Sequence, residues 1–171
     1  MKKYLLLLVS LMLVSPSAFA HLSIVGGIDY GLNSTTIADP TGLTSGVAYK
    51  SGLGFGGGLL YNFSAIEIGA LYLSKKSTAT ILGVDVSTTG SAIEIPVMFR
   101  MGGMFTNFGI GGFYDIYTGS LSGSNYGLTA GPHIGTPGGL FFDLRFNYGL
   151  KSQSAFTNTE DLLGLVGYAF H

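Results

Sequence analysis

The feature that most constrains this chain is a strict alternation of apolar and polar residues along most of its length. In LFFDLRFNYGLK, residues 140–151, every second residue from Phe142 to Leu150 is large and apolar. Successive side chains leave a strand on opposite faces, so a period of two predicts a strand with one apolar face. The same alternation predicts eight strands, at approximately 22–32, 50–61, 65–76, 90–101, 104–117, 125–135, 140–151 and 161–170.

The connections between these predicted strands alternate between short and long. Short turns are predicted at 62–64, 102–103 and 136–139, and the longer links, rich in Ser, Thr, Gly and Asn, are 33–49, 77–89, 118–124 and 152–160. In an up-and-down meander, this order puts every short turn at one rim and every long loop at the other. Outer-membrane barrels have this asymmetry, and tilted strands of about ten residues cross a bilayer.

The N-terminus has the features of a secretory signal. Lys2 and Lys3 precede an apolar run over 4–14, and Ala18-Phe19-Ala20 matches an A-x-A cleavage site. The apolar run is too short for a membrane-spanning helix, which needs about 20 residues. We therefore predict a cleavable signal peptide at 1–20 and one mature domain at 21–171, which begins at His21.

The composition is too apolar for a soluble domain. Only 10% of the residues are charged and the mean hydropathy is +0.47, whereas soluble domains carry about 25% charged residues. No later segment has the long apolar run of a membrane helix, and a closed barrel is the other structure that satisfies its backbone in lipid. Without Lys2 and Lys3, six basic residues face nine acidic ones, a net charge of −3 that argues against nucleic-acid binding. Cysteine is absent, which excludes disulfides and thiolate chemistry.

A row of glycines indicates which face meets lipid. Gly52, Gly54, Gly56 and Gly58 alternate with apolar residues on one predicted strand. On a soluble surface they would only weaken the strand, whereas in a narrow lumen they leave room for long side chains from the opposite wall. The predicted fold is therefore an all-β, eight-stranded antiparallel up-and-down transmembrane β-barrel, preceded by the signal peptide, with its apolar face outward.

Aromatic residues on that outward face fall toward the two rims. Amphipathic rings prefer membrane interfaces, so two aromatic girdles are expected around an aliphatic band. The predicted girdle residues are Tyr30, Tyr72, Tyr114, Tyr126 and Tyr148 at the long-loop rim, and Tyr61, Phe99, Phe108, Phe142, Tyr168 and Phe170 at the short-turn rim.

The inward face is predicted to hold a polar network. Its members are Asp29, Glu67, Glu94, Arg100, Asp115, His133, Asp143 and Arg145. Unpaired buried charges are costly, so pairing is expected. A hairpin turning at Gly83-Val84 would put Glu67 directly opposite Arg100. A three-residue loop within 136–139 would put His133 opposite Asp143, beside Arg145. Asp29 and Asp115 are further candidate partners of Arg145.

We interpret this network as structural filling of the lumen. The alternative is catalysis, in which Asp143 orients His133 as a base for acyl transfer. That reading needs a nearby nucleophile, but the position two residues after His133 is Gly135, and no serine is predicted beside it. His21, His133 and His171 are scattered without metal-ligand spacing. We therefore predict no enzyme, no metal and no cofactor. Pro96 falls at an inward strand position, where a bulge or a break in pairing is expected.

Three stretches resemble the small porin-like outer-membrane β-barrel family. They are SGLGFGGGLLYNFSAIEIGALYLSKK, a glycine-rich strand with its turn and return, SAIEIPVMFRMG, and the C-terminal DLLGLVGYAF. The resemblance implies an eight-stranded membrane barrel whose last strand is read by the barrel-assembly machinery. The family usually ends on the aromatic residue, whereas here His171 follows Phe170, which bears on how strongly that signal is recognised.

Together these features predict a monomeric integral protein of the outer membrane, in contact with its lipid and lipopolysaccharide. Its expected role is structural or surface-interactive, with a narrow or plugged lumen and a partner surface at 33–49 and 77–89. A small-solute pore is the alternative, and a soluble periplasmic lipocalin-like binding barrel is a second one.

Overall fold

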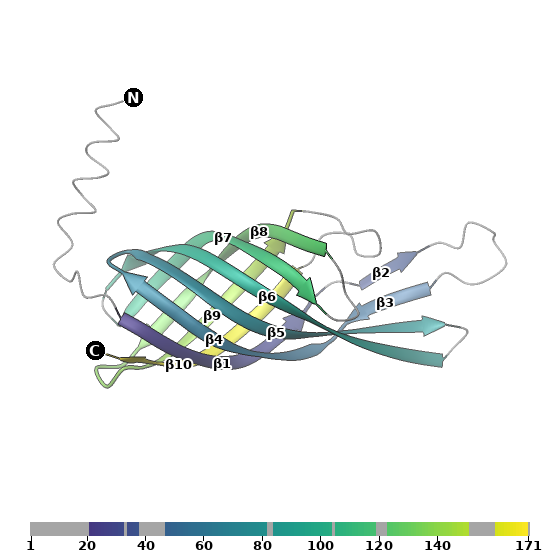
Figure 1. Ribbon diagram of the computed structural model, residues 1–171, viewed down its shortest axis with the longest axis horizontal. Coiled ribbons are helices and arrows are strands. Elements are labelled where there is room, and N and C mark those ends of the chain that lie inside the picture. Colours follow the sequence, from purple (N-terminus) through teal and green to yellow (C-terminus); the bar gives the residue numbers. More distant parts are fainter. Residues whose placement is uncertain are drawn as a thin grey trace, which may run out of the picture.

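The computed structural model describes residues 21–32, 34–37, 47–81, 84–103, 105–118, 123–150 and 160–170. The predicted signal peptide and the terminal His171 lie outside these residues. Every element of the described part is a strand (Figure 1). No helix in that part is long and apolar enough to cross a membrane.

Eight of the strands form a closed antiparallel barrel, which confirms the predicted fold class. Each strand pairs with its neighbours along the chain, and β10 returns to pair with β1. The barrel strands are β1 (His21–Gly31), β4 (Leu53–Phe63), β5 (Ile66–Ile81), β6 (Val84–Gly102), β7 (Thr106–Thr118), β8 (Gly123–Gly135), β9 (Leu140–Gly149) and β10 (Glu160–Phe170). This is an up-and-down meander, so no barrel strand is left as an open edge.

The short turns gather at one end of the barrel, together with the start of β1 and the end of β10. The first turn is centred on Ser64 and Ala65 rather than on the predicted 62–64, because β4 stays paired through Phe63. Ser64 turns the chain with a left-handed backbone, at a φ of 56°. We call this end the short-turn rim and the opposite end the long-loop rim.

At the long-loop rim the sheet continues past the barrel (Figure 1). Much of the predicted link 77–89 extends the hairpin, because β5 and β6 remain paired from Ser77↔Thr88 to Ile81↔Val84. Two short strands, β2 (Ser34–Ile37) and β3 (Val47–Ser51), extend this sheet in the order β2-β3-β5-β6. We call these four paired segments the rim sheet.

Gly52 separates β3 from β4 and marks a bulge. Ser51 pairs with Ser77, whereas Phe55 pairs with Ser74, so one strand carries an extra residue over this interval. The amide of Gly52 still donates to the carbonyl of Lys76, at 2.9 Å. A bulge bends a strand and increases its twist, which is how the rim sheet departs from the barrel wall.

Part of the lumen is a packed hydrophobic core with members on β1, β4, β5, β9 and β10. Its members are Val25, Leu60, Leu71, Leu73, Phe141, Leu163 and Leu165. The inward glycines sit where neighbouring strands come close. A Cβ on Gly54 or Gly58 would collide with a backbone carbonyl of β5, and one on Gly56 would collide with the Leu73 side chain. The glycines therefore accommodate the adjacent strand, rather than side chains of the opposite wall.

The outward face is apolar, as the alternation predicts. Its exposed members include Ile24, Phe55, Ile68, Val97, Ile110, Leu128 and Val166. All the predicted girdle residues lie on this outer face, where Phe99 and Tyr148 are half-buried and the others are exposed. Tyr168 and Phe170 meet edge to face, with their ring centroids 5.3 Å apart.

Pro96 interrupts the pairing of β6, as its missing amide donor predicts. The ladder between β5 and β6 runs to Ile68↔Val97 and resumes at Leu71↔Glu94. The register is the same on both sides, so this is a local break and not a bulge. On its other side, Pro96 still faces Phe113 of β7.

Candidate functional site

Four charged side chains meet inside the barrel near the short-turn rim. Glu67 comes from β5, Arg100 from β6, and Asp143 and Arg145 from β9. Alternation along each strand turns all four inward. Asp143 and Arg145 are 0% exposed and Glu67 is 1% exposed. We call these four residues the plug.

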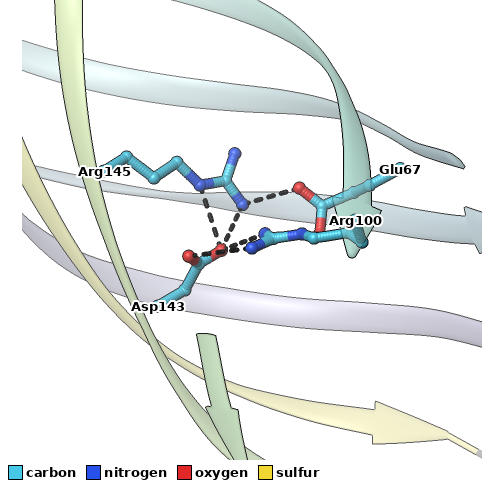
Figure 2. A network of polar contacts seen from close by, with 4 residues as sticks. All are labelled: Glu67, Arg100, Asp143 and Arg145. Atoms are coloured by element: carbon cyan, nitrogen blue, oxygen red, sulfur yellow. Dashed lines mark hydrogen bonds and ion pairs between the residues drawn. The ribbon is translucent and has the colours of Figure 1, made fainter. Parts of the chain in front are cut away.

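The plug is a balanced network of two guanidinium groups and two carboxylates (Figure 2). Arg145 donates from Nη2 to Glu67 Oε1 at 2.8 Å and to Asp143 Oδ2 at 2.6 Å. Arg100 donates from Nη2 to Glu67 Oε2 at 2.8 Å and to Asp143 Oδ2 at 2.5 Å. Each carboxylate thus accepts from both arginines, which ties β5 and β6 to β9 across the lumen.

The predicted partners of the plug are partly right. Glu67 does bind Arg100, but it lies opposite Met98 and not opposite Arg100, because the hairpin turns between Ile81 and Val84, one residue earlier than predicted, which shifts each cross-strand partner by two positions. The length of the arginine side chain spans this diagonal. Asp29 and Asp115 are the further candidate partners of Arg145, but the structure pairs Arg145 with Glu67 and Asp143, and Asp29 with Lys75.

A second group of charges lies inside the barrel toward the long-loop rim. Lys75 of β5 binds Asp161 of β10 at 2.6 Å and Asp29 of β1 at 3.3 Å. Glu94 of β6 and Asp115 of β7 are direct cross-strand neighbours, and both are 0% exposed. We call these five residues the acidic cluster, because one ammonium group faces four carboxylates.

Neutral polar side chains connect the acidic cluster across the lumen. Asn147 of β9 donates from Nδ2 to Glu94 Oε2 at 2.9 Å. The hydroxyl of Tyr117 donates to Asp115 Oδ2 at 3.4 Å. Three of the carboxylate oxygens, Asp29 Oδ1, Glu94 Oε1 and Asp115 Oδ1, are buried and have no hydrogen-bond partner among the described residues.

His133 lies opposite Asp143 in the ladder between β8 and β9, which is the predicted register. Its ring stacks on Phe141, with centroids 4.8 Å apart. Its Nδ1 atom is buried and has no hydrogen-bond partner among the described residues. Asp143 is instead engaged by the two arginines, so its carboxylate does not orient the imidazole.

Sequence reasoning missed two charged members of the lumen, Lys75 and Asp161. The alternation of inward and outward side chains, which identified the other members, also applies to these two. Lys75 lies an odd number of positions, three, after the outward Tyr72, and Asp161 directly precedes the outward-facing Leu162, so both face inward. Both lie at strand ends near the loops, where alternation is read less readily than in mid-strand. In the described part of the chain, no group of three His, Cys, Asp or Glu side chains is arranged to hold a metal ion.

No protein-family model matches the chain, and no curated protein matches it either. A solved structure does match: the outer membrane protein OprG from Pseudomonas aeruginosa, with a TM-score of 0.52 and 15% sequence identity. The match covers 92% of this chain and 99% of the OprG chain. At this identity the likeness concerns the fold, which is that of a small outer-membrane β-barrel.

Proposed function

We propose that this chain is an integral outer-membrane protein that acts as a closed, membrane-anchored platform for surface contacts. The observation that carries the proposal is the filled lumen, which holds paired charges and packed leucines. The side chains of Arg145 and Asp143 are 0% exposed, and so are Leu71 and Leu73 of β5 and Leu163 and Leu165 of β10, the strand adjacent to β9. The fold shared with an outer membrane protein and the apolar outer face support the location.

The plug supports a closed lumen rather than a pore. An eight-stranded barrel is just wide enough for side chains to fill it. In the plug, each carboxylate is bound by both arginines, so opening a water path means separating four charge-assisted contacts. Such contacts between buried groups are costly to break one at a time.

The rim sheet supports the surface role. It places β2, β3 and the distal parts of β5 and β6 beyond the barrel wall, as one antiparallel sheet rather than as separate loops. A paired sheet holds a surface in a fixed shape, which lowers the entropy cost of binding. A strand partner added to its edge would gain backbone hydrogen bonds.

Conductance tests the closed lumen. The mature chain 21–171, refolded and inserted into planar lipid bilayers, is expected to show no steady channels at neutral pH. Arg145→Ala shortens the side chain that spans the lumen. We expect stepwise single-channel currents for this variant and not for the unmodified protein. Steady single-channel conductance of the unmodified protein would favour the small-solute pore.

Location and surface role are tested separately. The protein is expected in the outer-membrane fraction, with gel migration that changes on heating, and recovery in the soluble periplasmic fraction would favour a lipocalin-like barrel. Replacing 77–88 by a tight turn is expected to leave the barrel folded and to lower cell-surface adhesion. Unchanged adhesion would argue against the rim sheet as the contact surface.

A further inference from the structure

The acidic cluster carries a charge imbalance that the plug does not. Lys75 is the cation that the structure pairs with it, and that ammonium is committed to Asp29 and Asp161. Glu94 and Asp115 are left side by side on adjacent strands, fully buried. Like charges directly opposite in a sheet are destabilising, and burial in a low-dielectric interior increases the repulsion.

A neutral side chain that contacts Glu94 also has an oxygen atom without a partner. Asn147 of β9 is 1% exposed. Its Oδ1 atom has no hydrogen-bond partner among the described residues. Asn147 already uses its amide nitrogen on Glu94, so its free carbonyl oxygen lies beside the carboxylate. A buried acceptor without a donor costs free energy, which a ligand of positive charge would recover.

We propose that the acidic cluster binds a hard divalent cation at Glu94 and Asp115, with Asn147 contributing a neutral oxygen. The donor set contains oxygen only, which is the set that Ca²⁺ and Mg²⁺ prefer. Two carboxylates supply the charge that a divalent ion needs, and water completes its shell. Ca²⁺ fits this set better than Mg²⁺, because it tolerates irregular geometry and six to eight ligands, whereas Mg²⁺ demands a near-ideal octahedron.

The acidic cluster is partly open at Lys75 and Asp161. Their side chains retain 13% and 9% exposure, whereas Glu94 and Asp115 are 0% exposed. We therefore expect an ion to enter past Lys75 and Asp161, from the side of the long-loop rim. The site is independent of the surface role proposed above, since it uses no residue of the rim sheet.

Tyr117 provides a built-in reporter. Its hydroxyl is 3.4 Å from Asp115 Oδ2, so an ion at Asp115 lies within a few ångströms of the phenol ring. Terbium replaces calcium at oxygen sites and emits when a nearby tyrosine is excited. The refolded mature chain, freed of metal by a chelator, is titrated with TbCl₃ and then with CaCl₂, with KCl at equal ionic strength as the screening control.

We expect saturable terbium emission that CaCl₂ reverses and KCl does not. Tyr117→Phe should remove most of the emission while calorimetry shows unchanged Ca²⁺ affinity. Glu94→Gln combined with Asp115→Asn removes both charged ligands, so Ca²⁺ affinity should fall beyond the about 10–100-fold typical of losing an indirect partner. Glu160→Gln removes a neighbouring carboxylate outside the cluster and should change neither quantity.

Three results would overturn the site: no saturable emission, emission that KCl displaces as well as CaCl₂ does, or equal Ca²⁺ affinity in the double variant. The last would mean an adventitious ion only. Heat-dependent gel migration establishes that each variant is folded. If the double variant does not fold, Tyr117→Phe still decides, because emission that persists without Tyr117 places the ion elsewhere.

Discussion

The plug and the acidic cluster lie in one lumen and bury similar side chains, yet they are built on opposite principles. In the plug, two arginines share two carboxylates, and each carboxylate is bound by both cations. In the acidic cluster, one lysine is ion-paired with two aspartates, and a glutamate and an aspartate stand beside each other without an ion pair among the described residues. The plug has as many positive as negative groups, whereas the acidic cluster has an excess of negative charge that only a bound cation would neutralise.

This difference shows that a buried charge is not by itself a sign of stability or of function. A fully satisfied network can lock strands together, whereas a partly satisfied one is a cost that the rest of the fold must offset. Even the plug is incomplete, because Arg145 Nη1 has no hydrogen-bond partner among the described residues. The number of buried hydrogen-bond acceptors without a donor is the property that distinguishes the two regions.

The largest contrast is expected from removing the central cation of the plug. Arg145→Met leaves Arg100 facing two buried carboxylates, and breaking a buried pair in this way costs about 3–5 kcal/mol. Urea unfolding of the protein refolded in lipid vesicles measures the loss. Arg145→Lys keeps the charge but loses the planar fork, so it should fall between this variant and the unmodified protein. If Arg145→Met lowered the free energy of unfolding by less than about 1 kcal/mol, the plug would stabilise the fold no more than an ordinary surface ion pair does.

Neutralising one carboxylate in each region should give opposite signs. Asp143→Asn removes a charge that accepts from both arginines, and hydrogen bonds to charged groups contribute about 1.5–3 kcal/mol. Asp115→Asn removes a repulsion from Glu94 and should be neutral or stabilising by about 0.2–1 kcal/mol in chelator. The same unfolding assay measures both variants. Equal destabilisation would mean that the two regions do not differ in charge balance.

The smallest effect is expected at the edge of the acidic cluster. Tyr117→Phe removes a long hydrogen bond to Asp115, which is worth about 0.5–1.5 kcal/mol at most. The free energy of unfolding in chelator should therefore fall only slightly. A loss as large as that of Asp143→Asn would show that Asp115 depends on Tyr117, and that the cluster has less unmet charge than the contacts indicate.

Which charged side chains face the lumen could largely be predicted from the alternation along each strand. Arg145 follows Leu144 and precedes Phe146, so alternation assigns it inward whatever the strand pairs with, and the same argument reaches Lys75 and Asp161. Its partners could not be predicted in this way. The pairing of Glu67 with Met98 depends on where a hairpin turns, and a shift of two positions preserves the face while changing every neighbour.

The sequence by itself determined that this chain forms alternating strands, which side of each strand is apolar, and which charges are buried. These properties are local, because the direction of a side chain depends on its place along one strand. The tertiary structure decided which charges meet. Closing the barrel brings β5 and β9 face to face, so that Glu67 reaches Arg145 across 78 residues of chain, and it sets Lys75 beside Asp29 and Asp161. Contacts across a lumen depend on the register of all the strands between them, and no single stretch of sequence carries that information.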